Sequence, residues 1–134
     1  FCFAIVDLDE LKRINHQHGY PAGDEVLSRL GELLRRNFSH KEIIGRWGGT
    51  EFVVGMAGIP KHEAKQRLFE VLQTLRQHKF TDIHGNVFQA TFSAAVVQYP
   101  QEGTDLPALY QAADAVLEQA KATGRNQVLS RKDV

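Results

Sequence analysis

Apolar residues recur along the chain with two different periods, and the changes between these periods predict the order of the elements. Residues 1–9 form a nearly continuous apolar run, which is typical of a buried strand ending at Asp7. The apolar residues of segment 22–38 instead recur at spacings of three and four, so this segment predicts an amphipathic helix. Between them, residues 9–19 predict a short helix closed by Gly19.

The second half of the chain continues this alternation of helices and paired strands. The expected elements are a hairpin of residues 42–47 and 51–57, a helix over 60–79, a second hairpin over 80–99 that turns around Gly85 and Asn86, a helix over 105–123 and a short strand over 126–130. Because most strands occur in hairpins, we expect an α+β fold with a central mixed sheet flanked by helices, and not a doubly wound parallel sheet.

Composition and charge limit the classes of protein to which the chain can belong. The chain has 134 residues, of which 43% are hydrophobic and 24% charged, so we expect one globular domain over 1–134. Sixteen basic residues balance sixteen acidic ones, which gives no electrostatic argument for a nucleic-acid partner, and we expect none. Cys2 is the only cysteine, so an intrachain disulfide is excluded and a cytoplasmic location is expected. The chain opens directly in a strand without Met, so we expect a domain of a larger protein. Whether that larger protein carries a membrane anchor stays open.

Four polar segments carry residues that suit a nucleotide site, namely 7–15, 22–27, 46–52 and 120–126. Asp7 and Asp9 lie where a strand is followed by a helix, and carboxylates there suit Mg²⁺. The amides that open the helix favour an anion at the same corner.

The other polar residues suit the two ends of a nucleotide. Lys12, Lys121 and Arg125 suit phosphate, while the amide of Asn15 and the carboxylate of Asp24 match the polar edge of guanine. Each residue also has an ordinary structural interpretation as a helix cap, a turn residue or a solvated surface charge.

Together the segments "VDLDELKRIN", "GDEVL", "RWGGTEF" and "AKATGRN" resemble the GGDEF domain of diguanylate cyclases. The resemblance extends over essentially the whole chain. It implies a fold related to the palm of nucleotidyl cyclases and polymerases, and a reaction in which two monomers, each carrying one GTP, make cyclic di-GMP. The helix and the Asn-Arg-containing stretch that usually open this family are absent from the sequence.

The resemblance also implies a role for individual residues. Asp7 and the backbone carbonyl of Leu8 would face Mg²⁺ or Mn²⁺, with Asp9 as an additional candidate ligand. Glu51 would be the acidic residue at the fourth signature position. The implied nucleotide contacts are phosphate at Lys12, Lys121 and Arg125, guanine at Asn15 and Asp24, and close backbone approach at Gly48 and Gly49.

The sequence departs from the family at the third signature position, which is normally an acidic metal ligand and is Thr50 here. Losing a metal carboxylate would cost about 3 to 5 kcal/mol of transition-state stabilisation, or roughly 10²- to 10⁴-fold in rate. Glu51 is adjacent, but neighbouring strand residues point to opposite faces, so it would compensate only in an irregular turn. The product site of the family would fall at Ser39 and Glu42, where both of its usual residues are missing, and we expect no feedback binding there.

Three hypotheses follow, and whether the chain is an enzyme stays open between them. The first is a GTP-binding regulatory module with impaired catalysis, which acts on an attached or partner phosphodiesterase or sensor domain. The second is an active but slow diguanylate cyclase that works as a homodimer, with Glu51 or Asp9 replacing the missing ligand. The third is an interaction module that binds no nucleotide.

Overall fold

The computed structural model describes residues 1–38 and 43–134 and contains a five-stranded sheet with the order β2-β3-β1-β6-β7. Its strands are β1 (Cys2–Leu8), β2 (Ile43–Trp47), β3 (Glu51–Met56), β6 (Phe92–Gln98) and β7 (Gln127–Ser130). The β2-β3, β3-β1 and β1-β6 pairs are antiparallel, whereas β6 and β7 are parallel. The expected mixed sheet is therefore confirmed. Ser39 and Glu42, on which the expected loss of the product site depends, lie outside the described residues.

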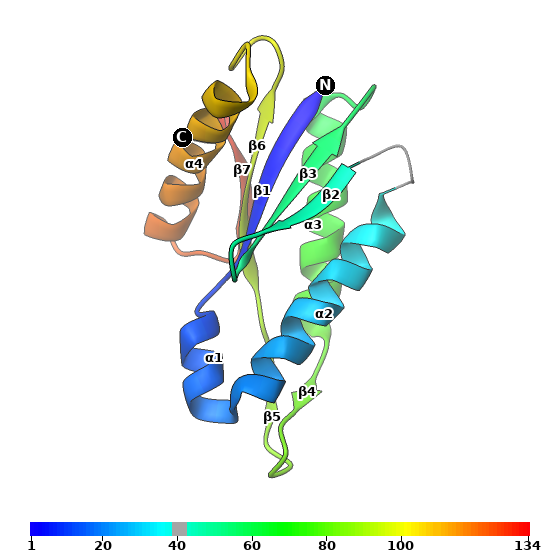
Figure 1. Cartoon of the computed structure of the whole chain (residues 1–134), viewed down its shortest axis with the longest axis vertical. Helices are drawn as coiled ribbons and strands as arrows, with labels where there is room; N and C mark the ends of the chain where they lie inside the picture. The colour runs from blue at the N-terminus through cyan, green and yellow to red at the C-terminus, as the bar shows by residue number, and fades with distance from the viewer. Residues whose placement is uncertain (39–42) are drawn as a thin grey trace.

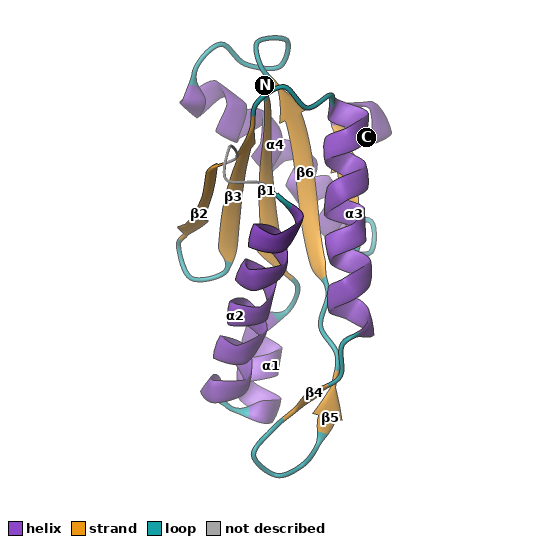
Figure 2. Ribbon diagram, turned by 90° about the vertical axis from the view of Figure 1, so that its right-hand side faces the viewer, coloured by secondary structure: helices purple, strands orange, loops and turns teal. Residues whose placement is uncertain are grey.

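Helices cover both faces of the sheet, which explains why its central strands are largely apolar on both faces. The helices are α1 (Leu11–His18), α2 (Tyr20–Asn37), α3 (Lys61–Gln77) and α4 (Leu106–Ala122). In Figures 1 and 2, α2 and α3 lie on one face and α4 on the other. In β1, Cys2, Ala4 and Val6 pack toward α2 and α3, whereas Phe3 and Ile5 pack toward α4. This alternation places the next odd residue, Asp7, on the α4 face.

Helices α1 and α2 each begin two residues away from the expected position. Helix α1 begins at Leu11 because Glu10 adopts a left-handed conformation with φ 54°, and its N-cap residue makes no side-chain capping bond. Helix α2 begins at Tyr20, and Pro21 fits its first turn, where no backbone N–H is needed. Asp24 therefore lies beyond the first turn of α2 and does not cap it.

The second hairpin was predicted incorrectly in its returning strand. Strands β4 (Phe80–Thr81) and β5 (Val87–Phe88) form a separate two-stranded sheet, and β6 begins only at Phe92. Asp82 closes the short hairpin because its Oδ1 accepts hydrogen bonds from the N–H groups of residues 84 and 86, each at 2.9 Å. Figure 2 shows this hairpin extending beyond the end of the main sheet.

The chain ends in a short 3₁₀ helix, Arg131–Asp133. Within residues 1–38 and 43–134, no helix combines the length and the apolar character that a bilayer crossing requires.

Candidate nucleotide site

The segments that carry the predicted site residues converge at one end of the sheet. There the end of β1, the β2–β3 turn, the start of α1 and the loop from α4 to β7 lie close together in Figure 1. Backbone hydrogen bonds join them: the N–H of Leu8 donates to the carbonyl of Thr50 at 3.3 Å, and that of Asp9 to the carbonyl of Thr91 at 2.9 Å. The folding of the sheet thus gathers residues that are far apart in the sequence.

Asp7 is a buried carboxylate with one paired oxygen and one unpaired oxygen. It lies opposite Glu51 in β3 and Ser93 in β6. Its Oδ2 is 2.7 Å from the Nζ of Lys121 on α4. Its Oδ1 is also buried but has no hydrogen-bond donor among the described residues. A buried acceptor without a donor is costly, so this oxygen fits a cation or another ligand donor.

The electrostatic environment keeps Lys121 protonated. Partial burial lowers the pKa of Lys121, but the hydrogen bond to Asp7 and the charges of Asp7, Glu118 and Glu51 outweigh it, so the pKa is raised. The ammonium group therefore remains available either to Asp7 or to an arriving phosphate.

Glu51 lies on the same face of the sheet as Asp7. The regular pairing of the two strands places it there, so no irregular turn is needed. The two residues are direct antiparallel partners, and such side chains lie side by side on one face. The hydroxyl of Tyr110 on α4 donates to the Oε1 of Glu51 at 2.9 Å. Burial and then this bond raise the pKa of Tyr110 to about 12, so the tyrosine remains a donor. Thr50 precedes β3 in the turn and adds no charge.

Asp9 holds three segments of the fold together. Its Oδ1 accepts a hydrogen bond from the hydroxyl of Ser93 at 2.6 Å. Its Oδ2 accepts from the hydroxyl of Thr91 at 2.7 Å and from the N–H of Asn126 at 2.9 Å. Both oxygens thus already have protein donors, whereas Asp7 retains an unpaired one. Among the described residues, no group of three or more His, Cys, Asp or Glu side chains is arranged to hold a metal ion.

Asn15 and Asp24 are the residues for which the resemblance implies contacts to guanine. The Oδ1 of Asn15 is buried and has no hydrogen-bond donor among the described residues. It lies so close to Gly23 that a Cβ added there would be 1.8 Å away, so only glycine leaves this amide in place. Asp24 is exposed and borders a hollow of about 350 Å³.

The hollow beside Asp24 has apolar and cationic walls. Leu27, Ile44 and Phe52 contribute apolar surface, and Arg35 and Arg46 contribute positive charge. The hollow therefore offers both apolar contact and positive charge to a small organic ligand.

The remaining predicted residues are exposed around the site. Lys12 on α1 and Arg125 after α4 are exposed, and in the described part of the chain neither forms an ion pair with the Asp7 group. Gly48 has φ 65°, and an added Cβ at Gly48 or Gly49 would meet no atom within 4 Å. The turn is therefore open to a ligand, while Lys12 and Arg125 are free to reach outward.

Tyr110 and Trp47 are the residues near this site that sequence reasoning missed. Trp47 is 60% exposed, and its ring centroid lies 6.1 Å from that of Tyr110. In the sequence, Tyr110 looks like one more residue of the amphipathic helix. Its proximity to Glu51 depends on how α4 crosses the sheet, which no local pattern indicates.

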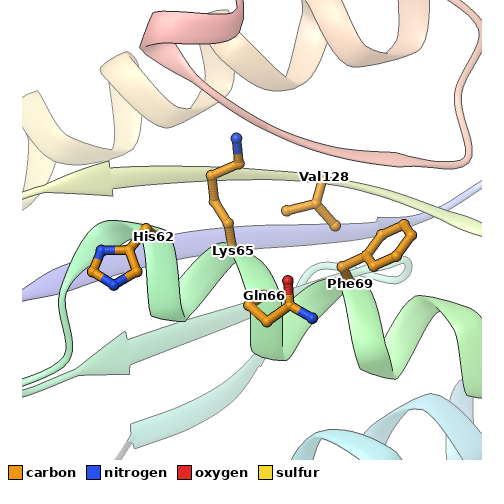
Figure 3. A pocket seen from close by; sticks show the side chains of 5 residues that line it. All are labelled: His62, Lys65, Gln66, Phe69 and Val128. Carbon is orange, nitrogen blue, oxygen red and sulfur yellow. The ribbon is translucent and has the colours of Figure 1, made fainter.

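A second hollow, of about 300 Å³, lies between α3 and β7. Figure 3 shows that it is lined by His62, Lys65, Gln66, Phe69 and Val128. The ammonium of Lys65 pairs with Asp133. None of the predicted site residues lines this hollow, so it is separate from the candidate site.

Comparisons with known proteins identify the family of the chain. The family model described as "Diguanylate cyclase, GGDEF domain" matches residues 1–127. The cyclic di-GMP phosphodiesterase NbdA of Pseudomonas aeruginosa is 33% identical over 130 residues, which are 96% of this chain and 16% of NbdA. The response regulator PleD of Caulobacter vibrioides is 34% identical over 132 residues, covering 95% of this chain and 28% of PleD.

A solved structure shows the same fold. The active GGEEF domain of a diguanylate cyclase from Vibrio cholerae matches with a TM-score of 0.83 and 27% identity, covering 96% of this chain and 81% of that one. The curated relatives are much longer proteins, and the chain spans only 16% and 28% of the two named above.

Proposed function

Because the chain belongs to the GGDEF domain family, we propose that it is a GTP-binding regulatory module of cyclic di-GMP signalling whose cyclase activity is impaired at Thr50. One observation carries the proposal. Two buried oxygens, Asp7 Oδ1 and Asn15 Oδ1, have no hydrogen-bond donor among the described residues. Buried acceptors are nearly always paired, so a ligand that supplies a donor or a cation at both places is favoured.

Asn15 and Asp24 would recognise the base of GTP. Guanine presents a ring N–H and an exocyclic amino group as donors and a carbonyl oxygen as an acceptor. The carboxylate of Asp24 would accept from the ring N–H, and the Oδ1 of Asn15 would accept from the exocyclic amino group. The neighbouring Leu27 lines the hollow and would contact the face of the ring.

Lys121, Arg125 and Lys12 would hold the phosphates. Lys121 is already protonated beside Asp7 and would exchange this partner for a phosphate oxygen. The open turn at Gly48 and Gly49 would admit the phosphate chain close to the backbone.

The diguanylate cyclases of this family generally use divalent metal ions. The unpaired oxygen of Asp7 fits such an ion, and Asp7, the carbonyl of Leu8 and Glu51 would hold Mg²⁺ or Mn²⁺ together with the nucleotide. When bound, the ion would stabilise negative charge on the phosphates. Asp9 would contribute less, because both of its oxygens already accept hydrogen bonds.

Thr50 is the reason to propose a regulator in preference to an efficient enzyme. Its hydroxyl is neutral and would replace a carboxylate poorly around Mg²⁺. The similarity to the phosphodiesterase NbdA supports a role in which this domain reports GTP to an attached or partner phosphodiesterase or sensor domain.

Calorimetric titration with GTP tests the binding function. We expect GTP to bind in the presence of Mg²⁺ and ATP to bind more weakly. Asp24→Ala should weaken GTP binding about 10- to 100-fold, since a hydrogen bond to a charged group contributes about 1.5 to 3 kcal/mol. The neighbouring Glu25→Ala, also exposed on α2, is the matched control and should leave the affinity unchanged. No heat with millimolar GTP and either metal would refute the proposal and favour an interaction module that binds no nucleotide.

A slow diguanylate cyclase is the second candidate, and the position of Glu51 beside Asp7 favours it. In this candidate, the carboxylate of Glu51 would hold the metal ion well enough for turnover despite Thr50. This candidate requires two GTP-loaded monomers to meet, so its rate per monomer should rise with protein concentration.

A further inference from the structure

Tyr110 contacts the site from α4, the helix that also supplies Lys121. Its hydroxyl donates to the Oε1 of Glu51 at 2.9 Å. Its ring is held by two other aromatic rings, with centroid distances of 6.5 Å to Phe3 and 6.1 Å to Trp47. The hydroxyl therefore approaches Glu51 from a ring whose orientation is restricted by packing.

Glu51 needs such a restraint because it lies at the first residue of β3, directly after the open turn. A glutamate side chain has several rotamers, and ordering it costs conformational entropy. The bond from Tyr110 uses Oε1 and leaves Oε2 without a partner among the described hydrogen bonds. Because Glu51 and Asp7 are direct partners across β3 and β1, this second oxygen lies on the face that Asp7 occupies.

We propose that Tyr110 is a positioning residue that fixes Glu51 beside Asp7, so that the two carboxylates bind a divalent cation together. The inference rests on the metal-assisted nucleotide binding proposed above. Thr50 supplies no charge at this end of the sheet, so the affinity for the cation depends on the placement of Glu51. Tyr110 would not touch the cation but would act only through the carboxylate it holds.

A double-mutant cycle on Mn²⁺ affinity tests this role. Binding of Mn²⁺ alone is followed by the electron paramagnetic resonance of the free ion in the wild type, Tyr110→Phe, Glu51→Gln and the double variant. We expect Tyr110→Phe to weaken Mn²⁺ binding about 10-fold, which is typical when a residue that orients a metal ligand is lost. In the Glu51→Gln background the same substitution should cause no further loss. An equal loss in both backgrounds would indicate a purely structural role and overturn the proposal.

Two further variants sharpen the test. Glu51→Asp retains the charge but shortens the side chain, so it should lose the bond from Tyr110 and weaken Mn²⁺ binding as Tyr110→Phe does. Tyr99→Phe is the matched control, because Tyr99 is an exposed tyrosine whose ring lies T-shaped to that of Phe1, at 6.3 Å between the centroids. Trp47 is the sole tryptophan and lies beside Tyr110, so its emission verifies local folding and reports quenching by bound Mn²⁺.

Binding of GTP in EDTA separates this proposal from the proposed function. If GTP binds and Tyr110→Phe leaves the Mn²⁺ affinity unchanged, the role of Tyr110 is refuted while the nucleotide site stands. If the wild type binds neither GTP nor Mn²⁺, the proposed function fails and the role of Tyr110 fails with it.

Discussion

Replacing Asp9 by asparagine should destabilise the fold without removing the metal site. Asp9 is 7% exposed and accepts three hydrogen bonds, from the hydroxyls of Thr91 and Ser93 and from the N–H of Asn126. These bonds tie the end of β1 to the start of β6 and to the loop after α4. The substitution conserves shape, removes the charge and places an amide donor against groups that also donate.

The magnitude follows from these three bonds. The two hydrogen bonds from hydroxyls would persist, because a hydroxyl can rotate to donate or accept, but they would no longer be charge-assisted. This change costs about 0.5 to 1.5 kcal/mol for each bond. The N–H of Asn126 would lose its acceptor, at a cost of about 1 kcal/mol, since Asn126 is exposed enough for water to compensate partly. The sum is about 2 to 4 kcal/mol, which would lower the Tm by roughly 10 °C.

Urea unfolding followed by circular dichroism measures this change. The exposed Asp24→Asn is the matched control, and its free energy of unfolding should stay within about 0.5 kcal/mol of the wild type. Mn²⁺ affinity is measured on the same samples below the unfolding transition. A fully stable Asp9→Asn variant that has lost Mn²⁺ binding would contradict the reasoning, because it would make Asp9 a metal ligand and not a structural tie.

Two other substitutions test the site, and a third tests the β4–β5 hairpin. Gly23→Ala should displace the amide of Asn15, because the new Cβ would lie 1.8 Å from its Oδ1, and calorimetry should show GTP affinity falling about 10-fold while ATP affinity changes little. Lys121→Met should weaken the binding of GTP more than the binding of guanosine in the same titration, since it removes a phosphate contact and leaves the base contacts in place. Asp82 should make stability depend on pH, because a hydrogen bond from His18 lowers its pKa from 3.8 to about 2 in the folded state. This contribution to the free energy of unfolding is complete above about pH 4 and disappears as the pH falls toward 2. In urea unfolding, the free energy of unfolding of Asp82→Asn should therefore fall less between about pH 4 and pH 2 than that of the wild type.

Local patterns predicted most of the elements because burial imposes them. The two-sided burial of β1 requires a continuous apolar run, and the one-sided burial of α2 requires apolar residues at spacings of three and four. The hairpin around Gly85 was also visible, but the separation of β5 from β6 was not. That break depends on Phe92 joining the main sheet beside β1, which is a long-range contact.

The site was predictable in its residue types but not in its contacts. The motifs predict that Asp7, Asn15, Asp24 and Lys121 contact one ligand, yet nothing local shows that Asp7 retains an unpaired oxygen while Asp9 has none. Glu51 was expected to compensate for Thr50 only in an irregular turn. The pairing of β3 with β1 places it opposite Asp7, because register across a sheet is set by the whole fold.

One assay tests the central claim most directly. The purified domain and its Thr50→Asp variant are incubated overnight with GTP and Mg²⁺ or Mn²⁺, and chromatography detects the linear intermediate pppGpG and cyclic di-GMP. The account predicts that the wild type binds GTP but forms little or no product, and that Thr50→Asp forms product at least about 10²-fold faster, as the loss of a metal carboxylate implies. Equal and efficient turnover by both proteins would contradict it, because Thr50 would then not be what limits catalysis.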